Sequence, residues 1–207
     1  MARIGSKLLA GKGKNRVAKA SGFGFACTAP FMCNGVCARN AEGASLYQLD
    51  EEVEADWWEV EALYDLCFAP GRRALSSYKL REGVPTIASL CLVARDEAGV
   101  LAAAIRFWPA KVGGHDILLL GPIAVHPTRQ GEGLGAMLIS ETLARAKDLG
   151  WARVLLVGDA PYYQRFGFRK LDGVVMPPPT NPDRVLGYNL VAGAWDGVQG
   201  DVHRPFG

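Results

Sequence analysis

The stretch Leu118–Gly150, LLLGPIAVHPTRQGEGLGAMLISETLARAKDLG, decides the fold. Its first part, Leu118–Val125, is an apolar run rich in branched residues, which predicts a strand buried on both faces. Gly121 and Pro122 interrupt this run. Because proline cannot donate a ladder hydrogen bond, we expect a bulge or kink at this pair. Apolar residues then recur at helical spacing up to Gly150, so the stretch predicts a strand, a turn and a helix.

The turn between strand and helix is rich in glycine and reads RQGEGLG over residues 129–135. Three glycines at alternate positions are expected to let the backbone curl and bring several N–H groups to one point. The helix that follows leaves its first N–H groups unpaired and directs the positive end of its dipole to the same place. Arg129 adds a cation. A phosphate or pyrophosphate is the natural ligand, although glycines alone are also compatible with a plain strand-to-helix turn.

Two other glycine-rich motifs are excluded by spacing. The order Gly131-x-Gly133-x-Gly135 lacks the Gly-x-Gly-x-x-Gly pattern of dinucleotide-binding folds. A P-loop requires Lys and then Ser or Thr after its last glycine, whereas Ala136 and Met137 follow here.

Two motifs together resemble those of the GNAT family of N-acetyltransferases. Residues 130–135 match the family's acyl-CoA loop, Gln/Arg-x-x-Gly-x-Gly/Ala, and Tyr163–Phe168 matches its second motif, Tyr-x-x-x-Gly-Phe. The resemblance extends over about 89–193 and is greatest to a bacterial subgroup whose substrates are mostly undefined. It implies a mixed α/β fold with a mostly antiparallel central sheet and flanking helices. It also implies a V-shaped splay between two central parallel strands.

The resemblance further implies which residues bind acetyl-CoA. The pyrophosphate is expected on the backbone of the glycine loop, and the pantetheine arm is expected to pair with the strand before it. Tyr163 is expected to donate a proton to the departing thiolate; the alternatives are that it only hydrogen-bonds the sulfur or packs with Phe166 and Phe168. The expected cofactor-binding residues are Ile123, Ala124, Val125, Arg129, Gln130, Gly131, Glu132, Gly133, Leu134 and Gly135.

The sequence does not identify a general base. His126, Asp159 and Glu97 are candidates without specific support. Where many relatives carry Asn-x-x-Ala before the tyrosine, this chain has Gly-Asp-Ala-Pro at 158–161. Part of the CoA contact set therefore stays open.

We expect an N-acetyltransferase that transfers the acetyl group of acetyl-CoA to a primary amine by direct attack in a ternary complex. The acceptor can be a small molecule or a protein, and no metal is expected. A longer-chain acyl-CoA acyltransferase and a non-catalytic acyl-CoA-binding regulatory module are the alternatives. The acidic stretch Asp50–Glu61 predicts either a lip that attracts an amine or a solvated helix face.

Composition is that of an ordinary globular domain. Of 207 residues, 49% are apolar and 21% are charged, and the net charge of +2 gives no sign of nucleic-acid binding. No apolar run approaches the roughly 18 residues of a membrane span. We therefore expect neither nucleic acid nor membrane as a partner, and we leave a homodimer open. Cys27, Cys33 and Cys37 match no common zinc spacing, and Cys67 and Cys91 are expected in the core.

The first 43 residues differ from the rest. They carry lysines and arginines with glycines scattered between them, and up to residue 41 they hold no acidic residue. We expect a flexible basic tail over 1–43, followed by the acyl-CoA N-acyltransferase domain over 44–207. The expected location is the cytoplasm, or an organelle if residues 1–41 form a transit peptide.

Overall fold

The computed structural model describes residues 46–68 and 70–206. All of these fall within Asn34–Gly207, the second of two units into which the chain divides. The expected basic tail and the three N-terminal cysteines lie outside the described residues. Within the described residues, no helix is both long and apolar enough to cross a membrane.

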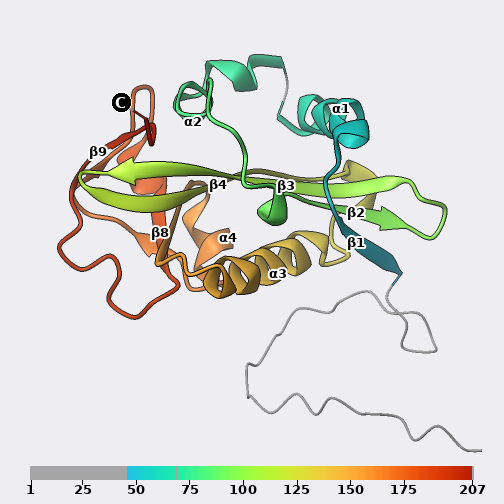
Figure 1. Ribbon diagram of the computed structural model, residues 1–207. Helices are drawn as coiled ribbons and strands as arrows, with labels where there is room; N and C mark the ends of the chain where they lie inside the picture. Colours follow the sequence, from blue (N-terminus) through green and yellow to red (C-terminus); the bar gives the residue numbers. More distant parts are fainter. Residues whose placement is uncertain (1–45, 69, 207) are drawn as a thin grey trace, which may run out of the picture. The chain divides into compact units, whose positions relative to one another are not determined.

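A nine-stranded sheet forms the centre of the fold (Figure 1). Its main order is β1-β2-β3-β4-β5-β8-β6, and β9 pairs with both β3 and β7. Neighbours are antiparallel except for the pairs β4–β5 and β7–β9. The mostly antiparallel sheet with two central parallel strands is therefore confirmed. The strands are β1 (Tyr47–Glu51), β2 (Leu92–Asp96), β3 (Leu101–Val112), β4 (His115–Val125), β5 (Arg153–Val157), β6 (Arg169–Lys170), β7 (Val174–Val175), β8 (Val185–Asn189) and β9 (Gly200–His203).

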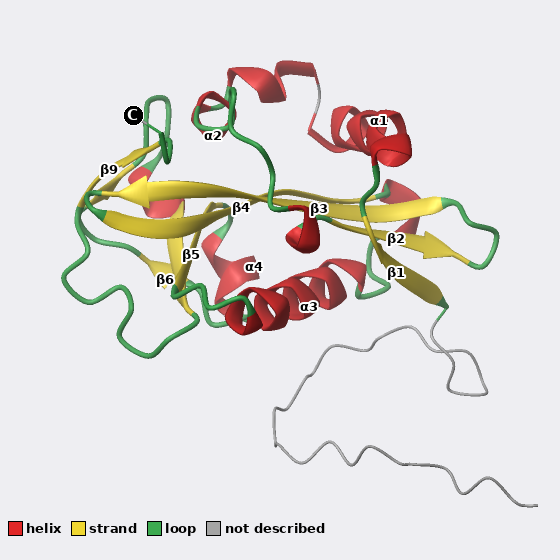
Figure 2. Ribbon diagram, viewed as in Figure 1, coloured by secondary structure: helices red, strands yellow, loops and turns green. Residues whose placement is uncertain are grey.

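Helices cover both faces of the sheet (Figure 2). On one face lie α1 (Trp57–Phe68) and α2 (Ser76–Lys79); on the other lie α3 (Leu134–Asp148) and α4 (Ala160–Gln164). Short 3₁₀ turns fill the connections. They are η1 (Glu54–Asp56), η2 (Pro70–Ala74), η3 (Ala88–Leu90), η4 (Pro127–Arg129) and η5 (Pro182–Arg184).

The alternation of side chains along β4 supplies both layers of the core. Leu118 and Leu120 belong to the cluster that includes Leu138 of α3, whereas Leu119 belongs to the cluster that includes Trp108 of β3. Successive strand residues point to opposite faces, so an uninterrupted apolar run fills both. The expectation of a strand buried on both faces is confirmed.

The expected bulge lies at Gly121 and Pro122. Leu120 pairs with Phe107 and Ile123 with Ile105, so two residues of β4 lie opposite the single residue Arg106 of β3. This two-against-one count is that of a β-bulge. The peptide bond between Gly121 and Pro122 is cis.

The splay between the parallel strands begins at the same point. β4 and β5 pair only at Leu118 with Val154 and at Leu119 with Leu155. Beyond Leu119 the two strands separate. We call the space between their carboxyl ends the V.

Some expected boundaries differ from the structure. The segment after α1 holds the turn η2 and a separate single turn of α2, because Leu75 stays extended between them. The acidic stretch begins in a strand, since Asp50 and Glu51 belong to β1. β2 is preceded directly by the turn η3. Short strands such as β9 carry too little periodicity to be predicted.

Candidate functional site

The glycine loop joins η4 to α3. Gly131 has φ 88° and Gly133 has φ 85°, the left-handed region that glycine adopts without a steric penalty. Gly133 is also the residue at which α3 is capped. The sequence correctly predicted a tight backbone curl at these two positions.

The third glycine has a different role from the one expected. Gly135 lies inside α3, and a Cβ built on it would lie 2.6 Å from the hydroxyl oxygen of Tyr162. Gly135 therefore admits a close neighbour and does not turn the chain. Tyr162, which the sequence left without a role, reaches from α4 to the first turn of α3. No spacing rule links these two positions, so only the folded arrangement reveals the contact.

The start of α3 offers unpaired N–H groups. The amide of Met137 donates to the carbonyl of Gly133 at 3.0 Å, which is the first i to i−4 bond of the helix. The amides of Leu134, Gly135 and Ala136 precede that bond and have no acceptor within the helix. Together with the helix dipole they favour an anion at this end.

Arg129 is held beside the loop by an ion pair. Its Nη2 lies 2.8 Å from Oδ2 of Asp96, at the turn between β2 and β3. The other carboxylate oxygen of Asp96 accepts from the amides of Ala98 and Val100. The guanidinium is thus anchored to a turn that lies far from the loop in the sequence.

The side chains of Gln130 and Glu132 point back to the sheet. Nε2 of Gln130 donates to the carbonyl of Val125 at 3.4 Å. The carboxylate of Glu132 accepts a short hydrogen bond from the hydroxyl of Tyr47 in β1. Burial and this carboxylate both raise the pKa of Tyr47. These contacts leave the backbone as the part of the loop that faces outward.

The end of β4 has one edge without a strand partner. Ile123, Ala124 and Val125 pair with β3 on one side. The amide of His126 donates to the carbonyl of Ala102 in β3. Because backbone groups in an antiparallel ladder alternate in direction, those of Val125 and Ile123 face the V.

Tyr163 lies at the end of β5, against the V. Its ring packs on Gly158, where a Cβ would lie 2.3 Å from Cε2, and it meets Phe168 edge-on with ring centroids 5.8 Å apart. The hydroxyl has no hydrogen-bond partner among the described residues. Burial raises the pKa of Tyr163 well above its ordinary value; the neighbouring Tyr162 adds to this and Arg184 opposes it. The phenol is therefore protonated at physiological pH.

The candidate bases differ in position. The ring of His126 bonds Thr128, with Nδ1 2.8 Å from Oγ1, and so completes the turn η4. Glu97 lies exposed in the turn between β2 and β3. Asp159 follows Gly158 and precedes α4, which places it beside Tyr163, with an exposed side chain.

The acidic stretch is neither a free lip nor a solvated face. Most of its carboxylates form ion pairs with arginines of the sheet and of the segment between α1 and α2. Glu61 is the centre: burial alone would raise its pKa, but hydrogen bonds from Arg72 and Arg106 outweigh burial and lower it. These pairs are Glu52–Arg106, Glu61–Arg106, Glu61–Arg72, Glu61–Arg73, Asp56–Arg95 and Glu59–Arg95.

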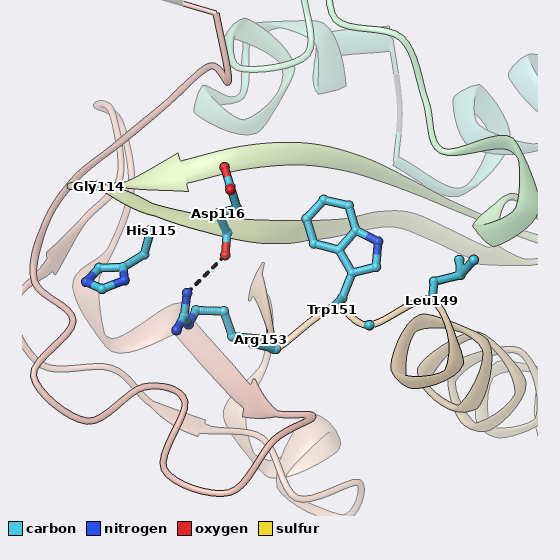
Figure 3. Close-up of a pocket in the computed structure, with 8 residues that line it drawn as sticks. Gly114, His115, Asp116, Leu149, Trp151 and Arg153 are labelled. Carbon is cyan, nitrogen blue, oxygen red and sulfur yellow. Dashed lines mark hydrogen bonds between the residues drawn. The ribbon is translucent and has the colours of Figure 1, made fainter.

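A surface hollow lies at the other end of the parallel strands (Figure 3). It has a volume of about 460 Å³ and is lined by the start of β4, the residues after α3 and the start of β5. Nη1 of Arg153 donates to the carbonyl of Asp116 at 3.1 Å within it. Neither the glycine loop nor Tyr163 lines this hollow, so it is separate from the V.

Comparisons with known proteins agree with this geometry. The family profile described as "Acetyltransferase (GNAT) domain" matches residues 88–170, which hold both the glycine loop and Tyr163. The uncharacterized N-acetyltransferase YhbS of Escherichia coli K12 is 34% identical over 119 residues. That alignment covers 56% of this chain and 70% of the relative.

Two solved structures share the fold. The crystal structure of Escherichia coli YhbS in complex with CoA has a TM-score of 0.66 at 28% identity and covers 79% of this chain and 95% of that one. A GNAT family acetyltransferase from Brucella melitensis in complex with acetyl-CoA has a TM-score of 0.59, also at 28% identity, with coverage of 77% and 96%. On its sequence, fold and site geometry, the chain belongs to the GNAT family of N-acetyltransferases.

Proposed function

We propose that this protein transfers an acetyl group from acetyl-CoA to a primary amine by direct attack in a ternary complex. The observation that carries the proposal is the V itself. An unpaired strand edge, an anion-binding helix start and a protonated phenol converge where β4 and β5 separate. The relatives crystallised with CoA and with acetyl-CoA support the choice of donor.

The pyrophosphate of acetyl-CoA is proposed to bind the backbone amides at the start of α3. Gly131 and Gly133 shape the curl, and the amides from Leu134 to Ala136 lack helical acceptors. Arg129 adds positive charge at the rim, partly offset by Asp96. The charge and the donors both suit a phosphate group.

The pantetheine arm is proposed to continue β4 across the V. Its amides are extended and carry donors and acceptors at strand-like spacing. The backbone groups of Ile123 and Val125 face the space that β5 has left, with Ala124 between them paired to β3. Binding in this way gives the arm main-chain hydrogen bonds in place of a missing strand.

Transfer then needs a neutral amine and stabilisation of the sulfur. The amine nitrogen attacks the thioester carbonyl, the new C–N bond forms, and the C–S bond breaks as the nitrogen loses its proton. The hydroxyl of Tyr163 is proposed to hydrogen-bond the departing sulfur. A buried phenol is a weaker acid than a CoA-type thiol near pKa 8.5, so complete transfer to a free thiolate is uphill. Tyr163 therefore acts by donating a hydrogen bond while charge develops and by relaying the proton the amine releases.

Calorimetry with acetyl-CoA tests the binding half of this proposal. Ala136 lies half-buried in the first turn of α3 and has ordinary helical backbone, so its substitution adds no glycine-type strain. Ala136→Glu places a negative charge among the phosphate-binding amides and is expected to weaken acetyl-CoA binding at least tenfold, whereas Ala136→Gln matches its size without the charge. Equal losses in both variants would mean that the phosphate lies elsewhere.

Turnover tests the chemical half. Tyr163→Phe keeps the ring that packs on Gly158 and removes the hydroxyl. We expect this variant to bind acetyl-CoA with unchanged affinity. Its rate of CoA release in the presence of amines should be about 10²-fold lower than that of the wild type. An acetyl-CoA-binding protein whose wild type releases no CoA with any amine in a broad screen would be a binding module instead.

A further inference from the structure

Arg81, in the segment after α2, is half-buried and has two donor nitrogens without an acceptor. Nε and Nη1 of Arg81 are both buried and have no hydrogen-bond acceptor. Buried donors are nearly always satisfied, because an unmade hydrogen bond retains the full cost of removing the group from water. Arg81 forms no ion pair with any of the described residues.

Two aromatic rings hold the guanidinium in place. Its Cζ lies 4.7 Å from the ring centroid of Tyr78 and 4.7 Å from that of Trp108. The remaining nitrogen, Nη2, approaches the bulge of β4, lying 3.6 Å from the position of a Cβ on Gly121. Nη2 of Arg81 thus lies where the V begins, while Nε and Nη1 are the buried donors behind it.

The neighbouring carboxylates form ion pairs with other arginines. Glu61 is bonded by Arg72 and Arg106, and Glu52 is bonded by Arg106. Burial, together with the charge of Arg106 and against the opposing effects of Tyr78 and Tyr64, lowers the pKa of Arg81 to about 10, so the guanidinium is protonated at neutral pH. A positive charge with unused donors therefore lies beside the proposed reaction centre.

The side of the sheet on which Arg81 lies indicates which part of the substrate its charge would contact. The glycine loop and α3 lie on one face, and the segment containing α2 lies on the other (Figures 1 and 2). If acetyl-CoA enters along the loop, its phosphates are on the opposite side of the sheet from Arg81. The anion near Arg81 then belongs to the part of the substrate that enters from the α1–α2 face, where the acceptor has access to the thioester.

We propose that Arg81 binds a carboxylate of the substrate, so that the preferred acceptor is an amine that also carries a carboxylate, such as an amino acid or a peptide end. This inference rests on the proposed acetyl transfer. A planar guanidinium held against aromatic rings is matched by a planar carboxylate at its edge. The same chemistry could come from a dicarboxylic acyl group on CoA, and the test distinguishes the two sources.

The test compares matched ligands that differ only in the carboxylate. The CoA-loaded protein is titrated with a panel of N-acetyl-L-amino acids and with the corresponding N-acetyl carboxamides. We expect at least one carboxylate to bind with an affinity about tenfold or more above that of its carboxamide, since a hydrogen bond to a charged group contributes that much binding free energy. Arg81→Met, which keeps the length of the side chain, removes the preference, and Arg81→Lys retains part of it.

Lys79→Met is the matched control, because it removes an exposed positive charge two residues away. It should leave the preference intact. Titration of each variant with acetyl-CoA reports folding and the donor site separately, so failure of the proposed transfer is distinguishable from failure at Arg81. A second arm compares succinyl-CoA with acetyl-CoA. Tenfold weaker succinyl-CoA binding in Arg81→Met, with acetyl-CoA unchanged, would assign the carboxylate to the acyl group. No dependence on Arg81 in either arm overturns the proposal.

Discussion

Arg106 and Glu52 are joined by two parallel hydrogen bonds, 2.7 Å from Nε to Oε2 and 2.6 Å from Nη2 to Oε1. Both side chains are almost buried, with exposed fractions of 9% and 11%. The pair ties the segment between β1 and α1 to the middle of β3, directly opposite the bulge of β4. It therefore fixes the chain that leads into α1 against the sheet.

Glu52→Gln is predicted to destabilise the protein by roughly 3 kcal/mol, because a buried charge loses much of its compensation. The measurement is the midpoint of urea unfolding. Lys170→Ala, which breaks an exposed ion pair with Asp183, is the control and should leave the midpoint unchanged. Equal midpoints for wild type and Glu52→Gln would show that Glu61 alone satisfies Arg106.

The contact between Tyr162 and Gly135 makes a prediction that two substitutions can test together. Gly135→Ala places a methyl group against the Tyr162 hydroxyl and is expected to weaken acetyl-CoA binding by displacing α4 from α3. Tyr162→Phe removes the clashing atom, since the ring carbon Cζ lies 3.9 Å from the Cβ position. The double variant should therefore bind acetyl-CoA more tightly than Gly135→Ala alone. Additive losses would mean that the effect does not pass through this contact.

Because the ring of Tyr163 packs on Gly158, a substitution of Gly158 is predicted to reduce turnover even though Tyr163 itself is unchanged. Gly158→Ala forces the ring away from the end of β5 and so displaces the hydroxyl that is proposed to meet the departing sulfur. We expect kcat to fall by about 10²-fold, because a displacement of about 1 Å of a catalytic group has effects of that size. Gly114→Ala is the matched control, since a Cβ there meets no atom within 4 Å. A normal kcat in folded Gly158→Ala would remove Tyr163 from the mechanism.

Because the pKa of Tyr163 is raised, deprotonation of this residue should cause no fall of kcat/KM on the alkaline side of the pH profile. The phenol is protonated below its pKa, which lies above the ordinary value of 10, so its hydroxyl remains a donor up to at least pH 10. The acceptor amine loses its proton as pH rises, so kcat/KM should rise with pH and then level off. Tyr163→Phe should lower the plateau and keep its shape. A fall below pH 10 that is present in the wild type and absent in Tyr163→Phe would contradict this.

The centre of the fold was predictable because its signals are local. The apolar run of β4, the interruption at Gly121 and Pro122, and the apolar spacing of α3 each depend on residues adjacent in the sequence. The same holds for the curl at Gly131 and Gly133. Propensity and spacing therefore sufficed to place the strand, the bulge, the loop and the helix.

The contacts that complete the site join distant segments, and the sequence could not supply them. Tyr162 meets Gly135 across two elements, and Asp96 holds Arg129 from another turn. The sequence contains the charge of Arg81, but it does not show that two donor nitrogens of this side chain are buried without an acceptor. The acidic stretch shows the same limit most clearly: its composition was visible, whereas the arginines that neutralise it come from elsewhere in the chain.

The short pairing between β4 and β5 has a mechanical consequence. Only two residue pairs join these strands, so the sheet consists of two half-sheets connected by a narrow seam. One half-sheet contains β1, β2, β3 and β4, and the other contains β5, β8 and β6. β9 crosses back to pair with β3 at Lys111 and Val112, and with β7 on its other side. Among the described strands β7 pairs only with β9, so these two short strands extend the half-sheet of β1 to β4 and form no ladder with β5, β8 or β6. Within the described part of the chain, the two pairs between β4 and β5 are therefore the only ladder that holds the two half-sheets together beside the V.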